Sequence, residues 1–216
     1  MKKSVLMLIG SLTLVTACSI NKPHEKKLAA EAAPLGLQEI KSNSLDAVFL
    51  DKAKIASYKQ VIIEPLDMSA VKIRKSSDMN IHDTPWELND QDRKFFQECY
   101  QASMKKEWLA KSTLTQVKQT GSSTLKVKAT LVEIAPLGSK DDTKGRPTMT
   151  KVYSEGMGTM TLKYELSDSE TGKVLGLISD QRDLGKMWEE NNRITFNQKV
   201  RLAFDAWARR LQKELM

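Results

Sequence analysis

Nucleophilic or metal-binding chemistry in this chain would have to use a small set of side chains. The chain has two cysteines, Cys18 and Cys99, and two histidines, His24 and His82. A cysteine nucleophile needs a base beside its thiol, and a zinc site usually combines several histidine and cysteine ligands. The histidines stand far apart in polar sequence, and no recognisable motif places a base next to Cys99. We therefore expect no enzyme activity, no cofactor and no metal site, with Cys99 buried on the apolar face of a helix.

Acidic and glycine-rich patterns elsewhere favour ordinary structure over a site. Asp141 and Asp142 could bind a cation, but lysines flank the pair, and we interpret it as a solvated turn. Gly156-Met157-Gly158 lacks the third glycine of a dinucleotide-binding fingerprint, since Thr161 stands in its place. The two glycines indicate instead a β-bulge or a closely packed backbone. The sequence contains neither a nucleophile-elbow serine motif nor a phosphate-binding P-loop.

Cys18 is the one cysteine with a specific chemical context. The chain opens with Lys2-Lys3 and an apolar run from Val5 to Val15, which is typical of an export signal. A spanning helix needs about 20 apolar residues, so a transmembrane anchor or a buried core helix fits this short run less well. Leu14-Val15-Thr16-Ala17 before the cysteine resembles the bacterial lipobox. The resemblance implies cleavage before Cys18 and transfer of a diacylglycerol to its thiol as a thioether.

The residue after the lipidated cysteine influences whether a lipoprotein stays in the inner membrane or moves to the outer one. In proteobacterial lipoproteins an aspartate there usually signals retention in the inner membrane, whereas a serine permits transfer to the outer one. Ser19 occupies this position, so the resemblance implies a palmitate-bearing lipoprotein of the outer membrane that faces the periplasm. One acyl chain anchors a protein only marginally, but bacterial lipoproteins carry three, which would hold the chain stably through Cys18.

Charge and cysteine content limit the partners of the processed chain. Lys2 and Lys3 leave with the signal, so 34 basic residues become 32 against 27 acidic ones, and the formal charge falls from +7 to about +5. Such a mild excess could favour anionic headgroups or acidic partners, but it more often reflects a solvated surface. Nucleic acid is not expected as a partner in this compartment. Because Cys18 is committed to lipid, Cys99 has no intramolecular disulfide mate.

The composition predicts three segments. Residues 1–17 form the signal peptide, residues 18–44 form the lipidated cysteine and a flexible tether, and residues 45–216 form a single periplasmic domain. Pro23, Pro34 and Gly36 interrupt any periodicity in the second segment, and this composition is typical of a mobile linker.

Alternation and helical periodicity predict the elements of the domain. Strands are expected at 58–66, 71–73, 124–134, 152–166 and 174–178, with a turn at 168–172. Asn89 is expected to cap a helix that runs to about Ala110. Thr195 and Gln198 fit a capping box for a last helix, in which Phe196, Phe204, Trp207 and Leu211 belong to one apolar stripe. We predict an α+β fold with an antiparallel-rich sheet of about four strands and two amphipathic helices packed on one face.

Several short patterns together resemble a family of Gram-negative lipoproteins, the domain-of-unknown-function family 3313. They are Phe49-Leu50-Asp51, the strand Val61-Ile62-Ile63-Glu64-Pro65, Asp180-Gln181-Arg182, Trp188, and the run from Phe204 through Trp207-Ala208 to Leu211. The resemblance would cover most of residues 45–216. It implies a location in the envelope and a fold, but no chemistry, because the family carries no assigned activity.

The densest charge cluster of the sequence is a candidate contact for a partner. Asp180, Arg182 and Asp183 stand at the end of the last strand, and they fit either an ion-pair network or a partner contact. Trp86 and Trp188 lie outside the helical stripes and fit either an interface or a cap on the core. We expect a non-enzymatic, membrane-anchored module that binds an envelope protein or another envelope component. An accessory subunit of an envelope transport or assembly complex is the alternative, and stoichiometric co-purification would distinguish it.

Overall fold

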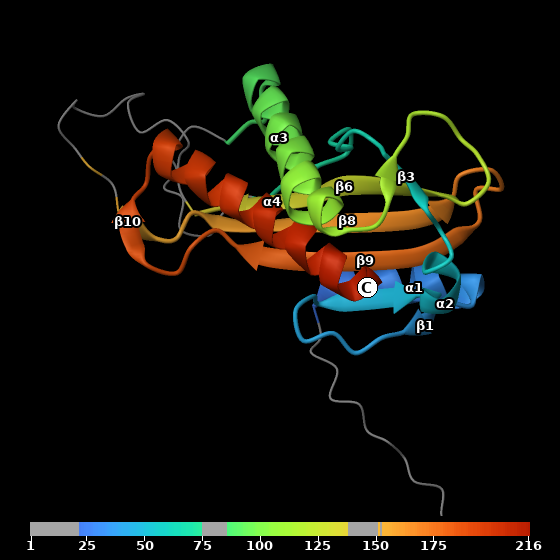
Figure 1. The fold of residues 1–216 in the computed structure, drawn as a ribbon. Coiled ribbons are helices and arrows are strands. Elements are labelled where there is room, and N and C mark those ends of the chain that lie inside the picture. Colours follow the sequence, from blue (N-terminus) through green and yellow to red (C-terminus); the bar gives the residue numbers. More distant parts are fainter. Residues whose placement is uncertain (1–21, 75–85, 138–150, 152) are drawn as a thin grey trace, which may run out of the picture.

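The computed structural model describes residues 22–74, 86–137, 151 and 153–216 (Figure 1). The signal peptide, Cys18, Ser19, His82 and the Asp141-Asp142 pair lie outside these residues. Within them the fold is a mixed α+β structure with four α-helices and one large, mostly antiparallel sheet. None of the described helices is both long enough and apolar enough to cross a membrane.

The large sheet has eight strands in the described residues, twice the number predicted. In sheet order they are β1 Gln38–Glu39, β2 Ala47–Leu50, β9 Val174–Asp183, β8 Gly158–Asp168, β6 Thr124–Pro136, β3 Gln60–Ile63 and β5 Thr115–Gln116, and β4 Lys72–Ile73 also pairs with β6. The long pairs β6–β8, β8–β9 and β2–β9 are antiparallel, whereas β3 and β4 lie parallel to β6. The prediction of about four strands was wrong because β1 and β5 are too short to show a period. β2 was missed because it is buried on both faces and shows no alternation.

A glycine-rich kink divides the strand predicted at 152–166 into two. β7 (Tyr153–Glu155) pairs with β10 (Trp188–Glu190) in a separate two-stranded sheet, and β8 begins after the kink. Gly158 has φ +107°, and a Cβ atom there would lie 2.2 Å from the carbonyl oxygen of Ala135. The prediction of a closely packed backbone at Gly156-Met157-Gly158 is confirmed.

Helices α3 and α4 pack together on one face of the sheet (Figure 1). α3 (Asp90–Ser103) opens with the predicted cap at Asn89, whose side chain accepts from the Asp92 backbone N–H at 2.9 Å. The chain continues through a π-helical turn, Met104–Trp108, and a 3₁₀ turn, Leu109–Lys111. α4 (Arg193–Leu215) is capped by Asn192, not by the predicted Thr195 box. Asn192 caps the helix because its side-chain carbonyl oxygen accepts a hydrogen bond from the Thr195 backbone N–H at 2.9 Å.

An aromatic cluster joins these helices in the core. Phe204 of α4 makes edge contacts with Phe96 and Tyr100 of α3 and with Trp207, at centroid separations of 6.3, 6.2 and 5.5 Å. Trp207 is 0 % exposed, as the apolar stripe of α4 predicted. Cys99 is buried beside this cluster, which confirms its expected place.

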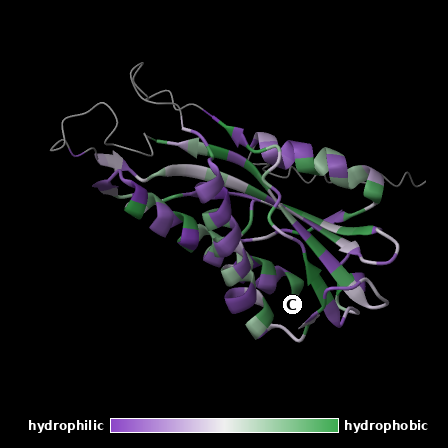
Figure 2. Ribbon diagram, turned by 90° about the horizontal axis from the view of Figure 1, so that it is seen from above, coloured by the Kyte–Doolittle hydropathy of each residue, from purple (hydrophilic) through white to green (hydrophobic). Residues whose placement is uncertain are grey.

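The segment predicted as a flexible tether is folded onto the sheet from Lys22 onward. Pro23–Ala32 forms α1 and Ala33–Leu35 a 3₁₀ turn, and α1 lies on the opposite face from α3 and α4 (Figure 2). Leu28 and Ala32, four positions apart, are buried against Phe49 and Leu177. The tether prediction fails for residues 22–44 because this contact with the second face of the sheet stabilises a helix whose own sequence shows little periodicity.

Candidate functional site: an open polar cavity at the end of β9

An open cavity of about 640 Å³ lies where the start of α1, the end of β9 and the C-terminal half of α4 meet. Its lining mixes both signs of charge: Lys22, Glu25, Lys41, Arg182, Asp183 and Arg210. The segment before β2 closes one wall, since Ser42 donates to Glu214 of α4 at 2.6 Å and Arg210 donates to the Ser44 carbonyl. A cavity of this size and character suits a polar or charged segment of a partner better than an apolar ligand.

Asp46 is the hub of this region. One carboxylate oxygen accepts from Lys22 Nζ at 2.8 Å, and the other accepts from the Gln181 backbone N–H at 2.9 Å and contacts His24 Nε2 at 3.0 Å. Burial opposes ionisation of Asp46, but the hydrogen bonds from His24 and Lys22 outweigh it and hold the pKa well below its usual range. Asp46 therefore joins the first residues of α1 to β9 as an ion-pair clamp.

Asp180 is a second carboxylate at this site, and it is buried (3 % exposed). It accepts from Trp207 Nε1 at 2.9 Å and from the Asp46 backbone N–H at 3.1 Å. Loss of solvent raises its pKa, and the nearby Asp46 charge adds to this, whereas the Trp207 N–H and the guanidinium groups of Arg182 and Arg210 oppose it. All of these contacts are internal, so Asp180 holds β9 to α4 and to the residue that precedes β2.

The other residues predicted as a partner contact lie nearer the surface. Arg182 is 3.9 Å from Asp180, and loss of solvent lowers its pKa. Asp183 lines the cavity and pairs with Lys186 at 3.3 Å. Trp188 is 72 % exposed on the neighbouring sheet β7–β10, whereas Trp86 is buried against Phe196. The structure thus places Asp180, Arg182 and Asp183 along the cavity, with Asp180 almost fully buried in its wall, and leaves Trp188 on an outer surface.

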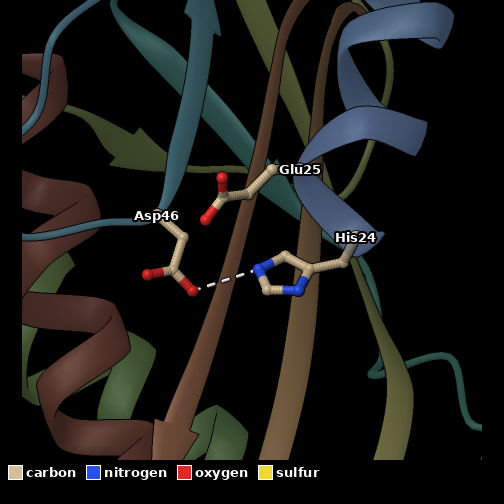
Figure 3. A group of neighbouring side chains, drawn as sticks. All are labelled: His24, Glu25 and Asp46. Carbon is tan, nitrogen blue, oxygen red and sulfur yellow. Dashed lines mark hydrogen bonds and ion pairs between the residues drawn. The ribbon is translucent and has the colours of Figure 1, made fainter. Parts of the chain in front are cut away.

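His24, Glu25 and Asp46 place potential metal-ligand atoms within 4.8 Å of one another (Figure 3). An imidazole and two carboxylates are a donor set that zinc accepts. Both oxygens of Asp46, however, already bind donors, and one of these is the Lys22 ammonium group. A metal cation bound here would be repelled by the nearby Lys22 ammonium group. The arrangement is therefore better suited to holding α1 in place than to binding a metal.

Cys99 lies at a smaller groove between α3 and α4, beside Arg201 and Asp205. Burial raises the pKa of its thiol, and the hydrogen bond from Arg201 only partly offsets this. A thiol with a raised pKa carries little thiolate at neutral pH. The environment therefore agrees with a structural thiol.

The clamp residues Lys22, His24 and Asp46 were missed from the sequence because the first two were assigned to a tether. One local pattern could have indicated the helix that carries them. Pro23 stands at the first helical position and Glu25 in the first turn, and both are favoured at helix starts.

The chain belongs to a family of proteins of unknown function, DUF3313, whose model matches residues 32–211. The family resemblance expected from the sequence is thereby confirmed. No curated protein matches the chain.

Solved structures give only distant likenesses. A neuraminyllactose-binding hemagglutinin homologue from Helicobacter pylori is 15% identical, with a TM-score of 0.38 over 74% of this chain and 83% of its own. A DUF330 protein from Xanthomonas campestris is 9% identical, with a TM-score of 0.39 over 71% and 81%. The PelC dodecamer subunit from Paraburkholderia phytofirmans is 8% identical, with a TM-score of 0.35 over 82% and 96%. At these TM-scores the likenesses carry no functional argument.

Proposed function

We propose that this protein is a lipid-anchored component of the bacterial cell envelope that binds another envelope component and does not act as an enzyme. The observation that carries the anchor is the lipobox-like Leu14-Val15-Thr16-Ala17-Cys18 directly after an export signal. Ser19 favours the outer membrane, with the folded domain in the periplasm.

The positions and contacts of the charged side chains around the cavity support the binding role. Asp46 and Asp180 are committed to the Lys22, His24, Trp207 and Gln181 contacts that hold the fold together. Arg182, Asp183 and Lys41 line the same open cavity and are less buried than these two carboxylates. Such a mixed-charge surface selects a partner by complementary charges and hydrogen bonds. We therefore place partner binding at this cavity.

The anchor is tested by metabolic labelling with a fatty-acid analogue in a bacterial host. The wild-type chain should take up the label, and Cys18→Ser should remain unprocessed and unlabelled because a hydroxyl cannot form the thioether. Ser19→Asp should keep the label and move the protein to the inner-membrane fraction. Normal labelling of Cys18→Ser would overturn the anchor.

The binding surface is tested by photo-crosslinking in cells. A photo-reactive amino acid at Asn43, an exposed residue of the cavity wall, should capture a defined partner. The matched control is the same amino acid at Lys118, which is also exposed and is not part of the cavity lining. Capture of identical products at both positions, or none at Asn43, would contradict binding at the cavity.

A further inference from the structure

Two exposed aromatic side chains share the outward face of the sheet β7–β10. Trp188 lies opposite Glu155 and Tyr153 lies opposite Glu190 in the antiparallel register. Opposed residues point to the same face, and that face alternates along each strand, so Trp188 and Tyr153 are diagonal neighbours on one side. The intervening Glu189 faces the other way and pairs with Lys199 of α4 at 2.8 Å. The aromatic face is therefore turned away from the body of the domain.

Trp188 and Tyr153 are the exposed members of the chain's four tryptophans and four tyrosines. Trp188 is 72 % and Tyr153 54 % exposed, and Met187, which directly precedes β10, is 75 % exposed. The chain's other three tryptophans, Trp86, Trp108 and Trp207, are 6 %, 1 % and 0 % exposed. Adjacent large apolar side chains left in water mark a surface that contacts something else.

The residues just before this face and the point where the chain enters the domain border the same cavity. Lys22 and Lys186 line the same cavity, and Met187 and Trp188 follow Lys186 directly. The clamp to Asp46 fixes Lys22 at the edge of this cavity. Four residue steps separate Cys18 from Lys22, and an extended chain spans at most about 3.6 Å per residue. The Cα atom of Cys18 therefore lies within about 14 Å of that of Lys22.

We propose that Met187, Trp188 and Tyr153 contact the headgroup region of the bilayer that holds the lipidated Cys18. The inference rests on the proposed lipid anchor, because the short link from Cys18 to the clamped Lys22 is what brings the membrane to this face. Tryptophan and tyrosine prefer the membrane–water interface, where their apolar rings and polar groups are both satisfied. The domain would thus lie against the membrane in one orientation, with the α3–α4 side free of it.

The neighbouring charges indicate what drives the contact. Lys151 pairs with Glu190 at 3.1 Å, and Lys186 pairs with Asp183 at 3.3 Å. Glu155, which lies opposite Trp188, adds a carboxylate to the aromatic face, so this face is not cationic. The contact should therefore depend on the aromatic rings more than on anionic lipid, and it should persist at about 1 M salt, where the Debye length is about 3 Å.

The fluorescence of Trp188 can report the membrane contact, because Trp188 is the exposed one of the four tryptophans. The full-length lipidated protein would be reconstituted into phosphatidylethanolamine–phosphatidylglycerol vesicles containing bromolipids, which quench tryptophan at the interface. We expect the wild type to lose up to about a quarter of its emission, and Trp188→Phe to lose almost none. Tyr153→Ser should reduce the quenching of Trp188, whereas Lys118→Ser, on an exposed residue outside this face, should leave it unchanged.

The acyl label is measured on the same preparation, which separates the two proposals. A labelled protein whose emission is unaffected by bromolipids, or equally affected in Trp188→Phe, would overturn the membrane contact and leave the anchor standing. An unlabelled Cys18 would overturn the anchor itself. Capture of a protein by a photo-reactive amino acid at position 188 in cells, together with unquenched Trp188, would reassign the face to a protein partner and overturn the membrane contact.

Discussion

Replacing Trp207 by phenylalanine should show how much the buried indole–carboxylate contact stabilises the domain. The substitution removes the N–H that Trp207 donates to Asp180 at 2.9 Å, while both residues are almost fully buried. A hydrogen bond to a charged group contributes about 1.5–3 kcal/mol. The smaller ring leaves space that costs about 1 kcal/mol, at about 24 cal/mol per Å³ of cavity. The free energy of unfolding should therefore fall by about 2.5–4 kcal/mol.

The assay is thermal unfolding followed by circular dichroism, combined with a double-mutant cycle. For a domain of this size each 1 kcal/mol lowers Tm by about 2–4 °C, so Trp207→Phe should lower it by roughly 5–15 °C. Asp180→Asn removes the charge and keeps one acceptor oxygen. Because the two side chains contact each other, the double mutant should deviate from additivity by about 1 kcal/mol or more.

Arg209→Ala is the surface control on the same helix. Its side chain is half exposed, and its ion-pair partner Glu107 lies 3.9 Å away. Such pairs contribute little, so unfolding should change by less than about 0.5 kcal/mol. Two results would refute the reasoning: additivity of Trp207→Phe and Asp180→Asn within about 0.5 kcal/mol, or equal effects of Trp207→Phe and Arg209→Ala.

Three further predictions concern the clamp, the N-terminal helix and the glycine kink. The pKa of Asp46 is lower in the folded state than in the unfolded state, where it is about 3.9. Ionised Asp46 therefore stabilises the fold above about pH 3.9, and this stabilisation is lost as the pH falls further. On acidification from about pH 5, the Tm of the wild type should fall more steeply than that of Asp46→Asn. Leu28→Asp should release α1 and raise amide exchange in residues 23–32, while amides of β6 and β8 stay protected, because Leu28 packs only in the small second cluster; exchange rising uniformly would contradict this. Gly158→Ala should destabilise the domain by more than about 1 kcal/mol in urea titrations, because its Cβ would collide with the carbonyl oxygen of Ala135. The comparison is Gly172→Ala, where φ is also positive (+68° against +107° at Gly158) but nothing lies within 4 Å; equal effects of the two alanines would show that the collision is relieved.

The long elements could be predicted from the sequence because their patterns are local. β6 alternates over many residues with one face buried, and the apolar stripe of α4 keeps helical spacing from Phe196 to Leu211. The cap at Asn89 was found for the same reason, since its partner Asp92 lies in the same turn. Periodicity and capping are properties of a few consecutive residues, and they survive without knowledge of the fold.

The rest depended on contacts between distant parts of the chain. α1 has little periodicity of its own and is held by the second face of β2 and by Asp46, which lies 22 residues after His24. The sequence showed that Asp180 and Arg182 are charged, but it did not show how deeply each side chain is buried. The fold shows that Asp180 is buried in the cavity wall against Trp207 of α4, whereas Arg182 and Asp183 lie nearer the surface of the same cavity.

The clamp at Asp46 gives the link between membrane and domain two possible lengths. With Lys22 and His24 bound to Asp46, the free linker after Cys18 spans no more than about 14 Å. If those bonds opened and α1 unwound, the 20 residue steps from Cys18 to Gln38, where β1 begins, would extend to roughly 70 Å. A pull on the acylated end would therefore first meet two ion pairs and a small apolar contact, and only afterwards the large sheet. The N-terminal helix would then unfold first and lengthen the linker before the force acted on the core of the domain.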